Sequence, residues 1–306
     1  MENVDIDKKN DVDFHYKRAM QKAKNNLVWF GIFSIVMLFS GLTSGYLVSS
    51  GDGFWVNFGM PKAFYTSTIL ILISSVTMFL AVRFAKKQER SKAITFIGIS
   101  IVLGLVFGFF QFQGWAEINE RGLVFSDKIY NTQEEKFNIK GEYGVDFSID
   151  FQGNRLMQEE DGFHFWGEDA IKIDEAEYKE LKSTKPKMAY GKDFVRVQKA
   201  REKNKKTKKR ENIFQVVVLT KKKLSENYLA KLKDNGNTSS SYFYLITIVH
   251  LAHFLFAIAY LFYLLITLLI GKNNEIYYQR IKRTGNFWHF FGGLWIYLLI
   301  FLFFIH

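Results

Sequence analysis

The sequence predicts an all-α membrane protein with five transmembrane helices, N-terminus inside and C-terminus outside, and a small α+β insert on the extracytoplasmic side. Three observations lead to this prediction. Hydrophobic residues make up 48% and charged residues 23% of the 306 positions, and the two kinds are segregated along the chain. Five apolar stretches carry no charge, and Lys and Arg gather in alternate connections between them. One remaining connection is long enough to form a small domain.

The five apolar stretches are each long enough to cross the hydrocarbon core of a bilayer, which takes about 20 helical residues. None contains Asp, Glu, Lys or Arg, and none has the polar face that a helix in a soluble core would show. They are residues 27–48, 63–82, 93–112, 242–270 and 287–305. We therefore divide the chain into a tail (1–26), helices 1–3 (27–113), an insert (114–241) and helices 4–5 (242–306).

The orientation follows from Lys and Arg, because short cytoplasmic loops carry these residues in excess. They are frequent in the N-terminal tail, between the second and third spans, and between the fourth and fifth spans. The connection between the first and second spans contains a single residue of this kind, Lys62. The tail is therefore expected in the cytoplasm, and the insert and the C-terminus on the outer side of the membrane.

The insert has a strongly acidic first half and a strongly basic second half. Alternating apolar residues predict strands at 143–151, 163–165, 194–197 and 213–219. Helices are expected at 175–182 and 223–233. The opposite charges of the two halves either pair within the domain or face partners.

The basic run at residues 199–210 reads KAREKNKKTKKR. We interpret it as a solvated, flexible connector, with a docking patch for an acidic partner or an anionic lipid headgroup as the alternative. The expected location outside the cytoplasm argues against nucleic acid as a partner, although such runs can bind it.

The residue types restrict the chemistry that the chain can perform. With no cysteine, the chain has no disulfide, thiolate nucleophile or iron–sulfur cluster. The spans contain no carboxylate, which argues against a proton relay or an ion-coupled transporter. We expect no catalytic, cofactor-binding or metal-binding residues in the chain.

Three histidines lie within the spans, where ionisable groups are functional candidates. His250 and His253 are three positions apart and therefore share a helix face, and His289 follows Trp288 in the last span. Hydrogen bonding to neighbouring helices is the favoured interpretation. Contact with a lipid headgroup and metal binding by the pair are the alternatives.

Small residues in the spans are expected where helices approach closely. They are Ser40, Gly41, Ser44, Gly45, Gly98, Gly104, Gly108, Gly292 and Gly293.

Several short motifs resemble subunit III of the haem-copper cytochrome c oxidases, in the form with five helices. The last span has W-H-F at 288–290 followed by Trp295, similar to the family's C-terminal signature, and Thr247, His250 and His253 are similar to its T-G-x-H-x-x-H. Residues 33–41 are similar to the family's F-x-x-S-E-x-x-F-F-x-G. Further similarities lie at Pro61, Thr66, Ser67, Gln111, Phe125, Ser126, Asp127 and Tyr130. The similarity runs through all five spans and leaves out residues from about 131 to 236.

The resemblance implies a non-catalytic accessory subunit of a terminal oxidase in a bacterial inner membrane, with the insert in the periplasm. Such a subunit packs against subunits I and II and holds phospholipid, while haem and copper lie in the partner subunits. His250, His253, Trp288, His289 and Trp295 are expected to bind lipid or to fix the helix packing. The insert would dock other respiratory subunits, such as cytochrome c domains or a quinol-oxidising complex.

The sequence departs from the family pattern at three acidic positions. Ile35 stands at the family's Glu of S-E, Gly114 at its Glu after the Gln of span three, and Gly292 at its Asp after W-H-F. The first departure argues against a direct role in proton uptake and leaves the packing role intact. The alternative function is a stand-alone membrane transporter or sensor that displays an external domain.

Overall fold

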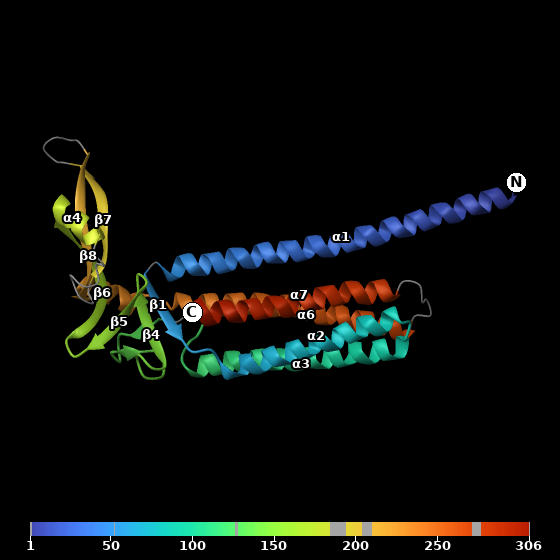
Figure 1. The fold of residues 1–306 in the computed structure, drawn as a ribbon. Coiled ribbons are helices and arrows are strands. Elements are labelled where there is room, and N and C mark those ends of the chain that lie inside the picture. The colour runs from blue at the N-terminus through green and yellow to red at the C-terminus, as the bar shows by residue number, and fades with distance from the viewer. Residues whose placement is uncertain are drawn as a thin grey trace. The chain divides into compact units, whose positions relative to one another are not determined.

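The computed structural model describes all residues except Met1, Asp52, 126–127, 184–193, 204–209, 271–276 and His306. The chain forms two compact units (Figure 1). The helical unit combines Met1–Ser49, Phe58–Asp127 and Asn237–His306. The sheet unit combines Ser50–Asn57 with Lys128–Gly236, so it takes a segment from between the first two spans as well as the insert.

Among the described residues, the helical unit contains five helices that are long and apolar enough to cross a membrane, which indicates a multi-pass membrane protein. They are α1 (Glu2–Ser50), α2 (Lys62–Lys86), α3 (Arg90–Glu120), α6 (Thr238–Ile270) and α7 (Tyr277–Ile305). Each contains one of the five predicted spans. The predicted tail is not a separate element, because α1 is continuous from Glu2. The helix α3 also continues beyond residue 113, where the helical segment was expected to end.

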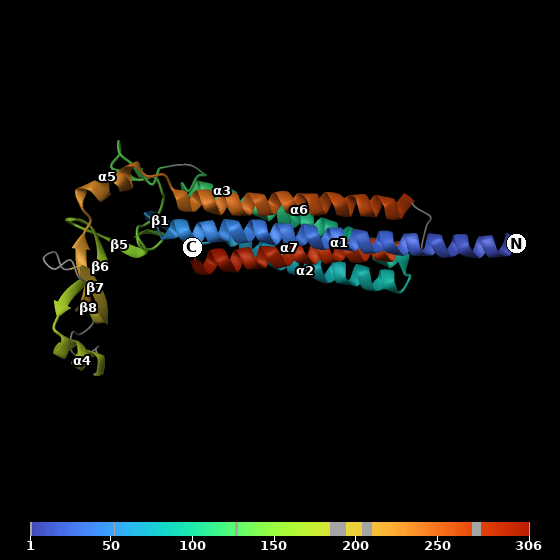
Figure 2. The ribbon, with the colours of Figure 1, turned by 90° about the horizontal axis from the view of Figure 1, so that it is seen from above.

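Helices α2, α3, α6 and α7 run side by side in both views, and the N-terminal part of α1 extends beyond them (Figures 1 and 2). Pro61 precedes α2 in an extended conformation. Proline suits the start of a helix, because it has no N–H to donate and its ring clashes with a preceding helical turn. The tight turn between α2 and α3 places Gln88 at φ 65°, a left-handed conformation.

Close packing between the helices depends on three glycines. A Cβ added to Gly114 would lie 2.2 Å from the ring of Phe64, one added to Gly104 would lie 2.7 Å from the indole of Trp288, and one added to Gly285 would lie 2.8 Å from Val82. Only Gly104 among them was expected at a helix contact. Gly45 and Gly292 make ordinary contacts, whereas Gly41, Gly98, Gly108 and Gly293 have open space beside them. The space beside Gly114 is filled by the ring of Phe64.

The sheet unit has one six-stranded sheet in the order β1-β4-β5-β6-β8-β7 and a two-stranded sheet of β2 and β3. The strands are β1 (Phe54–Phe58), β2 (Tyr130–Asn131), β3 (Lys136–Phe137), β4 (Phe147–Phe151), β5 (Asn154–Glu159), β6 (Gly162–Ile173), β7 (Phe194–Lys203) and β8 (Arg210–Lys223). The helices of this unit are α4 (Glu175–Ser183) and α5 (Glu226–Asp234). Antiparallel pairing joins β4 to β5, β5 to β6, β6 to β8 and β8 to β7. The prediction of an α+β region is therefore confirmed, and β1 was missed.

Three details of the predicted elements are wrong. The alternating pattern at 143–151 becomes a strand only from Phe147, because Gly144 and Val145 lie in a turn. The second helix begins at Glu226 rather than at residue 223, since Lys223 ends β8. The basic run is not a flexible connector at residues 199–203, which belong to β7 and pair with β8. Its residues 204–209 lie outside the described part of the chain.

The opposite charges of the insert pair with each other where β6 and the β5–β6 turn face β8. The ammonium of Lys222 lies 2.6 Å from Asp169, Lys223 lies 3.4 Å from Asp161, and Lys221 pairs with Glu159. Hydrogen bonds from Lys222 and Thr220 hold the pKa of Asp169 below its usual range. Of the two interpretations of the separated charges, pairing within the domain therefore holds at these positions.

We predict opposite effects for two alanine substitutions in α3. Gly114→Ala should destabilise the helical unit by about 1–3 kcal/mol, because the new methyl group overlaps the fully buried ring of Phe64. Gly108→Ala should leave stability unchanged or raise it by up to about 1 kcal/mol, since its site is open and alanine favours helix. Thermal unfolding of the two variants in detergent, followed by circular dichroism, measures the difference. Equal midpoints would contradict the packing at Gly114.

Candidate functional site

The five residues predicted from sequence lie on α6 and α7, and four of them meet around one aromatic cluster in the helical unit. The indole of Trp295 lies 5.3 Å from the His250 ring, 5.2 Å from Phe64 and 5.6 Å from Phe107, measured between ring centroids. Trp288, Trp295 and His250 are at most 1% exposed. Through these rings the cluster joins α2, α3, α6 and α7.

Both buried tryptophans of α7 donate hydrogen bonds to hydroxyl groups of α2. Nε1 of Trp288 lies 3.1 Å from Oγ of Ser74, and Nε1 of Trp295 lies 3.0 Å from Oγ1 of Thr68. Ser74 in turn donates to the carbonyl of Ser100 on α3, at 3.3 Å. Indole and hydroxyl groups inside a membrane need such partners, because no water is present to replace them.

The three histidines have different surroundings. Nδ1 of His289 lies 2.6 Å from Oγ of Ser75, so this side chain links α7 to α2. Nδ1 of His253 lies 2.7 Å from the carbonyl of Val249, one turn earlier in the same helix. His250 is surrounded by aromatic rings, and within the described residues neither of its ring nitrogens has a hydrogen-bond partner.

The expectation of hydrogen bonds to neighbouring helices therefore fits His289 and is wrong for His250 and His253. These two do share a face, since Phe39 and Phe291 lie within 6.4 Å of both rings. Aromatic packing, rather than hydrogen bonding, occupies that face. In the described part of the chain the pair is not a member of any cluster of three metal-ligating side chains.

A second polar link joins α2, α3 and α6. Gln111 donates from Nε2 to Ser67 at 3.0 Å, and Trp115 donates from Nε1 to Thr247 at 3.1 Å. Gln111 and Thr247 both belong to motifs noted in the sequence, while Trp115 was not identified as a site residue. A tryptophan just beyond an apolar stretch is the signal that could have found it.

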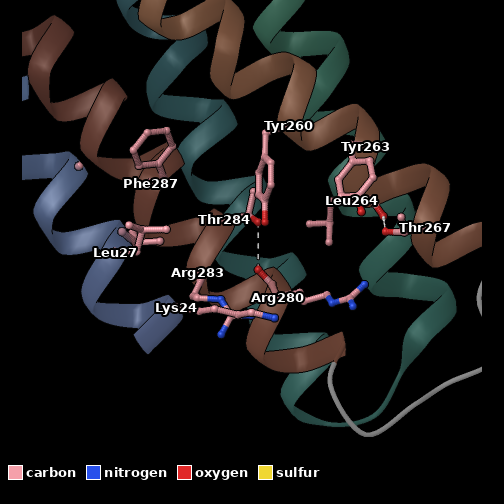
Figure 3. Close-up of a pocket in the computed structure, with 12 residues that line it drawn as sticks. Lys24, Leu27, Tyr260, Tyr263, Leu264, Thr267, Arg280, Arg283, Thr284 and Phe287 are labelled. Atoms are coloured by element: carbon pink, nitrogen blue, oxygen red, sulfur yellow. Dashed lines mark hydrogen bonds between the residues drawn. The ribbon is translucent and has the colours of Figure 1, made fainter. Parts of the chain in front are cut away.

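The helical unit also contains a pocket of about 520 Å³ between α1, α6 and α7 (Figure 3). Its lining combines three cationic side chains with apolar and aromatic ones. The lining residues are Lys24, Leu27, Val28, Gly31, Tyr260, Tyr263, Leu264, Thr267, Arg280, Arg283, Thr284 and Phe287. In Figure 3, Lys24, Arg280 and Arg283 gather on one side, and Phe287 and Leu27 lie apart from them.

Local bonds position the cationic side of the pocket. Nη1 of Arg283 donates to Oε1 of Gln21 at 2.5 Å and lies 3.4 Å from Oδ1 of Asn25, so it is tied to α1. Thr284 donates to the carbonyl of Arg280 at 2.9 Å. Cations beside an apolar cavity match the two parts of a phospholipid, whose phosphate is anionic and whose acyl chains are apolar.

None of the five predicted site residues lines this pocket, and the sequence did not predict it. Its cationic residues indicated only the orientation of the chain. The combination of Arg and Lys with Tyr and Phe at the ends of two spans is the signal that could have indicated a headgroup site.

Comparison with known proteins adds no further constraint. No protein-family model matches the chain, and no curated protein matches it.

We predict that the buried His250 and the half-buried His289 respond differently to leucine. His250→Leu should keep or raise stability, because it removes ring nitrogens that lack partners, an arrangement that costs about 1–3 kcal/mol, while losing ring contacts worth about 1 kcal/mol. His289→Leu should lower stability by about 1 kcal/mol, since it removes the bond to Ser75. Unfolding in mixed micelles of detergent and SDS measures both. A larger loss of stability for His250→Leu than for His289→Leu would contradict this prediction.

Proposed function

We propose that this chain is a non-catalytic accessory subunit, similar to subunit III, of a haem-copper terminal oxidase. The observation that carries the proposal is the meeting of two motifs that lie far apart in sequence. His250 of the T-x-x-H-x-x-H segment stacks on Trp295 of the W-H-F segment, with an interplanar angle of 29°. Such a contact is expected if the two motifs have a common structural role.

The residues of the spans support a structural role rather than a catalytic one. None of the five apolar stretches 27–48, 63–82, 93–112, 242–270 and 287–305 contains a carboxylate, and Ile35 and Gly114 stand where the family has acidic residues. Several of the polar groups that are present bond to one another between helices, as at Trp288 and Ser74. In this proposal the haem and copper lie in subunits I and II, and this chain stabilises them by helix packing and bound phospholipid.

The proposed location is a bacterial inner membrane, with the N-terminus in the cytoplasm and the sheet unit in the periplasm. In this orientation Lys24, Arg280 and Arg283 belong to the cytoplasmic side, in agreement with the excess of positive residues there. The pocket would then hold an anionic phospholipid of the cytoplasmic leaflet. The sheet unit would provide a docking surface for other respiratory subunits.

Purification from the native membrane tests the assignment. The affinity-tagged chain, solubilised in mild detergent, should bring with it partner subunits and the absorbance of reduced haem. A protein of the same helix count from another complex, tagged in the same way, is the control for non-specific capture. Recovery of the chain alone and without haem would contradict the proposal and favour a stand-alone transporter or sensor.

Substitution of the pocket arginines tests the lipid site. The double variant Arg280→Gln, Arg283→Gln should reduce the co-purifying anionic phospholipid about fivefold or more, because each cation near a headgroup contributes about 1 kcal/mol. Lipid extraction and mass spectrometry measure this ratio. Lys86→Gln removes an exposed cation at the end of α2 and serves as the matched control. Equal lipid content in the double variant and the control would exclude the pocket as a headgroup site.

A further inference from the structure

Three potential metal ligands converge at the turn between β5 and β6 in the sheet unit. Glu159 ends β5, Asp161 lies in the turn, and His164 is the third residue of β6. The register pairs His164 with Met157, which lies two residues before Glu159 on the same strand. The side chains of His164 and Glu159 therefore project from the same face of the hairpin. One ligand atom from each of the three residues lies within 4.8 Å of the other two.

His164 differs from an ordinary surface histidine. It is only 8% exposed, and its Nδ1 is buried without a hydrogen-bond partner. Nδ1 lies 3.7 Å from Oε2 of Glu159, and Nε2 lies 3.5 Å from Oδ2 of Asp161. A buried nitrogen that faces a carboxylate without bonding to it requires an explanation, since such groups are usually satisfied.

The separation between Nδ1 of His164 and Oε2 of Glu159 fits a shared cation better than a direct hydrogen bond. A hydrogen bond would bring nitrogen and oxygen to about 2.7–3.2 Å. Two ligands of one tetrahedral zinc ion, each about 2.0–2.1 Å from the metal, lie about 3.3 Å apart. Closure from 3.7 Å to that value needs only a small movement of the exposed Glu159 side chain.

We propose that Glu159, Asp161 and His164 form a binding site for a divalent transition-metal ion of the zinc type. One imidazole nitrogen and two carboxylates are a ligand set that zinc accepts, with water at the fourth position. The imidazole favours zinc over calcium, which prefers oxygen ligands in larger number.

Two lysines of β8 face the same carboxylates and set the strength of the site. Lys221 pairs with Glu159 through its other oxygen, Oε1, and Nζ of Lys223 lies 3.4 Å from Oδ2 of Asp161. Their charges attract the same carboxylates and therefore compete with a metal ion for them. The site is therefore of moderate affinity, and removing the lysines should strengthen it.

Zinc binding to the purified full-length chain tests the proposal. After treatment with a chelator and dialysis, the chain in detergent is titrated with zinc chloride in competition with a fluorescent zinc indicator. The wild-type chain should bind one more zinc ion than His164→Gln. Glu159→Gln and Asp161→Asn should each weaken that ion's binding about tenfold or more. Both replace exposed side chains by ones of the same shape, so they are expected to fold even if His164→Gln does not.

Matched variants separate this site from other zinc-binding residues. Glu160→Gln changes the carboxylate between the two ligands and should leave zinc affinity unchanged, and His253→Gln should leave the extra ion in place. Lys221→Met with Lys223→Met should increase the affinity several-fold. Calcium chloride at the same concentration should not displace zinc. Equal zinc stoichiometry and affinity in the wild type, Glu159→Gln and Asp161→Asn would overturn the proposal.

Discussion

Two indole N–H groups on α7, each bonded to a hydroxyl group of α2, are the interactions on which the arrangement of the helices depends. Inside a membrane, lipid chains compete equally with apolar side chains, so apolar surface alone does not hold helices together. Trp288 and Trp295 combine large buried rings with one donor each, and Ser74 and Thr68 supply acceptors at 3.1 and 3.0 Å. Each pair therefore fixes the distance between α2 and α7 and the rotation of α7 about its axis.

The remaining packing follows from the position of these rings. The Trp288 indole lies against α3 at Gly104, where no larger residue would fit, and Trp295 stacks on His250 of α6. Gly114 gives the Phe64 ring its space in the same way. The contacts between these helices are therefore made by rings, hydroxyls and glycines.

The sequence was sufficient to predict the five membrane helices, because each is an unbroken apolar stretch longer than the bilayer requires. It also predicted the strands of the insert near Phe163 and Ile213, though as shorter segments than β6 and β8. It missed β1, because this short strand follows a glycine-containing turn and pairs with residues almost 100 positions away. Such long-range pairing leaves no local pattern in the chain.

The candidate sites were harder to predict than the helices. Histidines inside a span attract attention, yet the His250 ring packs against other rings and its nitrogens have no partner among the described residues. The cationic pocket combines residues of α6 and α7 with residues of α1, which is far from them in sequence. The cluster of Glu159, Asp161 and His164 is close in sequence, but acidic turns are common, and the burial of His164 is visible only in the folded sheet.

A double-mutant cycle between Trp288→Phe and Ser74→Ala tests the central interaction most directly. The free energy of unfolding of the wild type, both single variants and the double variant isolates the coupling between the indole N–H and the hydroxyl. The structure predicts a coupling of about 1 kcal/mol, within the range measured for hydrogen bonds between membrane helices. A coupling of zero would contradict the claim that this bond fixes α7 against α2.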